Sequence, residues 1–108
     1  MSNVQNLVER VAEAIRKNGI EPYFIDGHHK DWKIGDHPPK RTMDVAQTFR
    51  YNHSDLENIT ATITVSEWTV SRYGSCTGKQ LLKIKVPANA SDKVIQNRIN
   101  KALAVYNA

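Results

Sequence analysis

The sequence contains one cysteine, Cys76, so no disulfide can form within the chain. An oxidising compartment would therefore add nothing to this fold, which argues against a small secreted disulfide scaffold. The N-terminal stretch MSNVQNLVERVAEAIRK lacks the continuous apolar run of a signal peptide, and no apolar run approaches the length of a membrane span. These absences predict a cytoplasmic protein with no membrane partner.

Low-complexity tracts and internal repeats are also absent. The chain has 108 residues, of which 40% are hydrophobic and 24% are charged, and these shares are typical of a globular protein rather than a disordered one. This length can bury a modest core, and a division into two parts would leave both too small. A single domain over residues 1–108 is expected.

Acidic residues are scarce in the second half of the chain. The formal net charge is +4, but residues 59–108 hold seven basic and only two acidic side chains, whereas residues 22–58 hold all four histidines. Such an imbalance can attract a polyanion or an acidic protein surface. The alternative is that the charge only keeps the protein soluble.

Helices are predicted at both ends of the chain. Between residues 4 and 15, apolar residues recur at helical spacing, and KNGI stops this helix by offering Gly19 for the left-handed position. The apolar residues are Val4, Leu7, Val8, Val11, Ala14 and Ile15. The second helix is expected to start at about Asn89 or Ser91. Its apolar stripe consists of Ile95, Ile99, Ala102, Leu103 and Tyr106.

Between the helices, several segments are typical of strands. EPYFID (21–26) indicates a short strand, and Trp32 with Ile34 forms either a brief return strand or an anchored loop. Residues 42–51, 59–70 and 81–86 alternate between apolar and polar side chains, as half-buried strands do. The middle segment changes phase at Trp68 and Val70, which predicts a bulge near Ser66–Glu67 or a change of the buried face.

This order of elements predicts an α+β fold. Strands joined by short turns make an antiparallel meander of three to five strands, which commonly buries one face. The two terminal helices would pack on that one face and form a two-layer sandwich. The threonines and lysines of the strands would then face outward.

The stretch RYGSCTGKQ, residues 72–80, resembles a phosphate-binding loop at first sight. Gly74, Gly78 and Lys79 give GxxxGK, one residue short of the phosphate-loop spacing, and Gln80 stands where a hydroxyl would bind magnesium. A phosphate loop also leads into a helix, whereas LLKIKV follows here with a period of two. We interpret the stretch as a hairpin tip whose glycines supply positive φ angles.

Two kinds of reactive site have weaker support. Cys76 has Arg72 and Lys79 near it in the sequence but no local histidine, so it is expected to be an ordinary thiol at the hairpin tip. His28, His29 and His37 lie in an Asp-rich loop with metal-ligand chemistry. Adjacent histidines point apart in extended chain, so a solvent-exposed loop is favoured over a metal-dependent hydrolase.

The favoured function is non-enzymatic binding of RNA or DNA, without a cofactor, through a basic sheet face and hairpin tips. Lysines of one strand parity project from one face and can contact phosphates, while exposed aromatic rings can stack on bases. The candidate residues are Lys40, Arg41, Trp68, Arg72, Tyr73, Lys79, Lys83 and Lys85.

A second hypothesis is a protein-interaction module or inhibitor, such as an accessory protein of a phage or mobile element, acting as a homodimer. Trp68 and Val70, out of phase with the buried residues before them, would then present apolar surface for contact. The alternative to binding is a solvated sheet face, whose lysines also guard against edge-to-edge aggregation.

Overall fold

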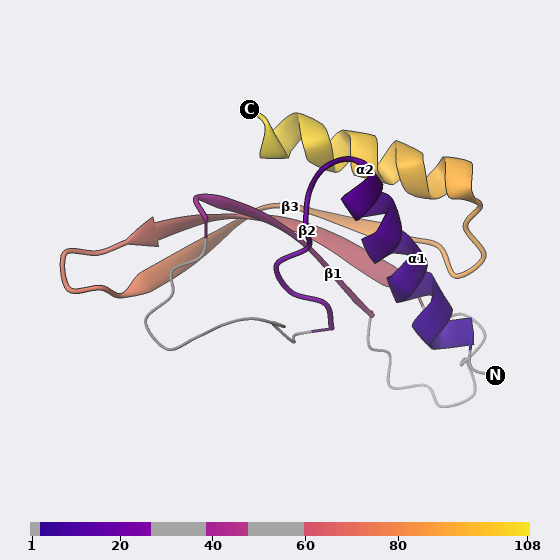
Figure 1. Ribbon diagram of the computed structural model, residues 1–108, viewed down its shortest axis with the longest axis horizontal. Helices are drawn as coiled ribbons and strands as arrows, with labels where there is room; N and C mark the ends of the chain where they lie inside the picture. Colours follow the sequence, from indigo (N-terminus) through magenta and orange to yellow (C-terminus); the bar gives the residue numbers. More distant parts are fainter. Residues whose placement is uncertain (1–2, 27–38, 48–59) are drawn as a thin grey trace.

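The computed structural model describes residues 3–26, 39–47 and 60–108. Within them the elements are α1 (Asn3–Lys17), β1 (Arg41–Gln47), β2 (Ala61–Val70), β3 (Cys76–Val86) and α2 (Asp92–Tyr106). The strands form an antiparallel sheet in the order β1-β2-β3. Both helices pack on one face of it (Figure 1), which confirms the predicted α+β arrangement.

The core lies between the helices and the central strand β2. Ile63 and Val65 are fully buried there, and the strand pairing places them opposite Val45 and Met43 of β1. Each such side chain contributes roughly 1.5–3 kcal/mol by leaving water. The helices complete this core with Leu7, Val8, Val11, Ala12, Ile15, Ile95, Ile99 and Ala102.

Helix α1 ends in the way that the KNGI motif predicts. Gly19 has φ +86°, and its N–H donates to the carbonyl of Arg16 at 2.9 Å, while the N–H of Ile20 donates to that of Ile15 at 3.4 Å. These two hydrogen bonds supply donors to carbonyls that would otherwise have none in the last turn, and they define a Schellman motif. The reversal turns the chain back toward the sheet.

The segment that follows α1 differs from the predicted antiparallel meander. The N–H of Tyr23 donates to the carbonyl of Met43, and the N–H of Val45 donates to that of Phe24. The bridge between Ile25 and Val45 is parallel, so residues 23–26 extend the β1 edge in the same direction as β1. A strand formed by EPYFID is therefore confirmed only as a short bridge.

The other predicted boundaries hold in part. Strand β3 begins at Cys76 rather than at Leu81, and α2 begins at Asp92, after Ser91, whose hydroxyl accepts a bond from the N–H of Val94 at 3.3 Å. The predicted strand residues 48–51 and the Trp32–Ile34 segment lie outside the described residues. Among the described residues, neither helix has the length and apolar character needed to cross a bilayer.

Replacing Gly19 with alanine tests the α1 stop. A Cβ at this position would have nothing within 4 Å, so the only cost is the left-handed backbone conformation. We expect Gly19→Ala to lower the free energy of unfolding by about 1 kcal/mol, measured by urea denaturation. Lys17→Ala, two residues earlier and exposed, should stay near the wild-type value; equal stability of both variants would contradict the motif.

Candidate functional site

The predicted hairpin tip is confirmed. The N–H of Ser71 donates to the carbonyl of Ser75 at 2.8 Å, and the N–H of Gly74 donates to that of Ser71 at 3.0 Å. Gly74 has φ +84°, so a type I turn followed by a left-handed glycine forms a three-residue loop. The Ser71 hydroxyl accepts bonds from the N–H groups of Tyr73 and Ser75. Since β3 follows directly, the stretch is not a helix-capping phosphate loop.

The second glycine of this stretch serves a different purpose from the predicted one. Gly78 lies inside β3, directly opposite Trp68 of β2, and it has no positive φ. A Cβ on Gly78 would lie 2.7 Å from Cζ3 of the indole ring. Gly78 therefore leaves room for the ring, and only Gly74 supplies the conformational freedom of a turn.

Trp68 is held against the sheet on the face opposite the helices. Its indole N–H donates to the Thr42 hydroxyl at 2.9 Å, and its backbone N–H donates to the carbonyl of Lys40 at 2.7 Å. The ring is half-buried. Trp68 is therefore not the exposed ring that was predicted to stack on a base.

The predicted irregularity is present, but it belongs to the partner strand. The register between β2 and β3 shifts between Val65 and Ser66, because Leu81 is an additional residue in β3. Trp68 stays on the same face as Ser66, so β2 itself does not change its phase at this point. The apparent change in the sequence arises because the buried face of β2 ends before Trp68.

The expectation that Lys79, Lys83 and Lys85 share one face of the sheet is wrong, because β3 has a bulge at Leu81. Lys83 and Lys85 are paired with Thr64 and Thr62 and project from the face opposite the helices. Lys79, on the other side of the bulge, is paired with Glu67 and shares the face on which the helices lie. A strand bulge reverses the parity of every residue beyond it.

Arg41 has a structural role that sequence reasoning missed. Its Nη1 donates to the carbonyls of Val105 and Tyr106 at 3.3 and 3.2 Å, and also to that of Ala108. Its Nη2 lies 3.3 Å from the Glu67 carboxylate. A cation favours the negative end of the α2 dipole, so Arg41 is engaged within the fold. Lys40, beside it, is exposed.

Both acidic residues of the second half, residues 60–108, form ion pairs with arginines of the first half. Glu67 pairs with Arg41, and Asp92 pairs with Arg10. In the part of the chain that the structure describes, none of the seven basic residues of this half forms an ion pair. They are Arg72, Lys79, Lys83, Lys85, Lys93, Arg98 and Lys101. Both acids are thus neutralised by arginines from elsewhere, and no acid of the described residues pairs with the cations.

Four of these cations lie on the β2–β3 hairpin. We call this hairpin the cationic hairpin. Arg72, Lys79, Lys83 and Lys85 are all exposed. No acidic residue occurs between Glu67 and Asp92. Tyr73, 90% exposed, lies at the tip beside Arg72. The structure thus brings six of the eight predicted binding residues onto one hairpin, and the sixth, Trp68, is held against the sheet.

The described residues contain no group of three side chains suited to hold a metal ion. His28, His29 and His37, the candidate ligands, lie outside the described residues. Cys76 is exposed, and it opens β3 opposite Val70 rather than sitting in the turn.

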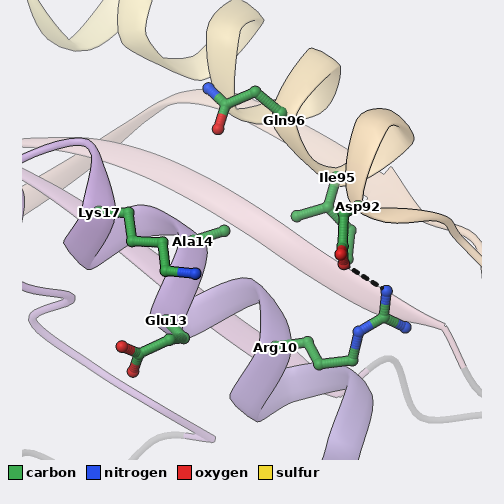
Figure 2. A pocket seen from close by; sticks show the side chains of 7 residues that line it. All are labelled: Arg10, Glu13, Ala14, Lys17, Asp92, Ile95 and Gln96. Atoms are coloured by element: carbon green, nitrogen blue, oxygen red, sulfur yellow. Dashed lines mark hydrogen bonds and ion pairs between the residues drawn. The ribbon is translucent and has the colours of Figure 1, made fainter.

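A groove of about 250 Å³ separates the two helices (Figure 2). Arg10 spans its end, donating to the Asp92 carboxylate at 2.8 Å and to the carbonyl of Ala90 at 3.1 Å. Lys17 and Glu13 line the α1 side, so the groove carries both signs of charge. The Arg10–Asp92 pair links the two helices across this groove, and the mixed charge makes the groove less suited to a polyanion than the hairpin.

The Arg10–Asp92 pair makes stability depend on pH. The hydrogen bond and the charge of Arg10 hold the pKa of Asp92 below its usual value. A depressed pKa stabilises the fold above the pKa of the unfolded chain, and this contribution disappears as the pH falls through the folded pKa. We expect Arg10→Gln to raise the pKa of Asp92. An NMR titration of the Asp92 carboxyl group measures this change. Arg16→Gln is the control, and an unshifted Asp92 in Arg10→Gln would contradict the pairing.

Gly78→Ala tests the contact beneath Trp68. The new methyl group must displace the indole ring and weaken its bond to Thr42, which we expect to cost about 1–2 kcal/mol in urea denaturation. Thr77→Ala, on the neighbouring exposed position, is the matched control. If both variants unfold at the same urea concentration, the ring does not depend on Gly78.

Comparison of the chain with protein-family models, with curated proteins and with solved structures finds no match.

Proposed function

We propose that the protein binds nucleic acid through the cationic hairpin. One observation carries this proposal: every basic side chain of residues 60–108 lacks an ion pair within the described residues, whereas both acids of that half are paired. Unpaired surface cations are available to phosphates, and releasing the counterions of a polyanion favours binding.

The face opposite the helices supplies the main contacts. Lys83 and Lys85 project there from β3, opposite the half-buried Thr64 and the buried Thr62 of β2. Ammonium and hydroxyl groups are typical partners of phosphate oxygens, and such contacts fix the position of a backbone without reading its sequence. The proposed binding is therefore weakly sequence-dependent and strongly salt-dependent.

Removing these two charges tests the proposal. We expect Lys83→Gln/Lys85→Gln to weaken binding to a short labelled DNA duplex by about tenfold or more at 0.1 M salt. The slope of log K against log salt should also fall by about 2, because each lost phosphate contact removes close to one unit. Fluorescence anisotropy over a salt series measures both quantities.

Arg16→Gln/Lys17→Gln is the matched control, since it removes the same charge from α1, away from the hairpin. Its affinity and salt slope should stay close to those of the wild-type protein. Equal losses in both double variants would show that only net charge matters. No binding of DNA or RNA by the wild-type protein at low salt would refute the proposed function.

A further inference from the structure

The end of the β2–β3 hairpin is exposed to solvent on both strands. We call residues 69–80 the arm, and all of them are exposed. Figure 1 shows this end of the hairpin extending beyond both helices. The only large hydrophobic residues that are exposed in the described part of the chain, Val70 and Tyr73, also lie in it.

The arm is preorganised although no helix packs on it. A two-stranded hairpin alone is marginally stable in water, so this one needs support at its base. Trp68 gives that support by covering Gly78 and donating to Thr42. At the other end, the Ser71 hydroxyl satisfies two backbone N–H groups of the turn. The arm is thus supported at both ends by contacts within the chain.

The chemistry of the arm fits a polyanion with hydrogen-bonding edges. On one face, Thr69 is paired with Thr77, and next to them the backbone N–H of Ser71 donates to the carbonyl of Ser75. Arg72 adds a charge at the tip, and the arm has no acidic residue. Hydroxyl and guanidinium groups are the kinds of side chain that contact both phosphates and the base edges of a groove.

We propose that the arm inserts into the major groove of duplex DNA, with Arg72 and Tyr73 at its leading end. This inference rests on the proposed function and adds a binding mode and a substrate class. The major groove of B-form DNA, about 12 Å wide and 8.5 Å deep, admits a two-stranded ribbon without deformation, whereas the minor groove, about 6 Å wide, would first have to be widened. From Trp68 to Arg72, at about 3.3 Å per residue, the arm reaches roughly 13 Å, enough for that depth. The deep, narrow major groove of duplex RNA excludes it.

The test compares three ligands of one sequence with the full-length protein: a 20-base-pair DNA duplex, the matching RNA duplex and the single DNA strand. We expect the wild-type protein to prefer the DNA duplex, and Arg72→Gln/Tyr73→Ser to lose about tenfold in affinity for it alone. Dimethyl sulfate footprinting should show protection of guanine N7, a major-groove atom, by the wild-type protein and not by the variant. Lys17→Gln, with the same loss of charge, is the control and should keep both the preference and the protection.

The outcomes separate this inference from the proposed function. Equal affinity for all three ligands, or guanine N7 protection that survives in Arg72→Gln/Tyr73→Ser, overturns groove insertion while the Lys83 and Lys85 result still stands. If the variant turns a dimer into a monomer in light scattering without changing DNA affinity, the arm is a contact between copies of the chain, and groove insertion is wrong. If no nucleic acid binds, both proposals fail. Circular dichroism checks that the variant is folded, as expected because Tyr73 is 90% exposed.

Discussion

The structure depends on a difference between the two ends of β2: the first half is buried in the core, and the second half is not. In its first half, Ile63 and Val65 lie between two neighbouring strands and beneath both helices, fully removed from water. The pairing with β1 ends at Glu67, apart from one further bond from the N–H of Trp68 to the carbonyl of Lys40, so beyond Trp68 only β3 remains as a partner. Trp68 stands at this border, where the packed core stops and the hairpin must support itself. The indole ring over Gly78 replaces the missing third strand with a local contact.

The same border explains the division of charge. On the packed side, Arg41 links Glu67 to the end of α2, and Arg10 links Asp92 to α1. These exposed or partly exposed pairs add little to stability one by one. Their larger effect is on the field of the molecule, since they cancel the only two acids of residues 60–108 and leave the cations of that half to act together.

Much of the fold could be predicted because its signals are local. Helical spacing around Val11 and Ile99, the glycine stop at Gly19, and the period of two before Pro87 each depend on neighbours in the sequence. The turn at Gly74 is equally local. These features led to the order of elements, to the hairpin, and to most of the basic residues on it.

What could not be predicted depends on partners that are far apart in the sequence. The bulge at Leu81 is a property of the β2–β3 register, and it alone decides that Lys79 leaves the face of Lys83. The role of Arg41 at the end of α2, and that of Arg10 beside Asp92, join residues more than sixty positions apart. Gly78 looked like a turn residue because the sequence does not show that an indole ring lies above it.

The lysines of β3 also have a purpose that needs no ligand. β3 lies at an edge of the sheet formed by the described residues, and charged side chains together with a bulge discourage other chains from pairing with such an edge. Edge protection, however, works with charges of either sign. It does not explain why residues 68–91 hold four cations and no acid, or why both flanking acids are neutralised by arginines from the other half. A surface that must only stay soluble gains from mixed charges, whereas one that meets phosphates gains from a single sign. The one-sided charge of the hairpin therefore favours a polyanionic partner over edge protection alone.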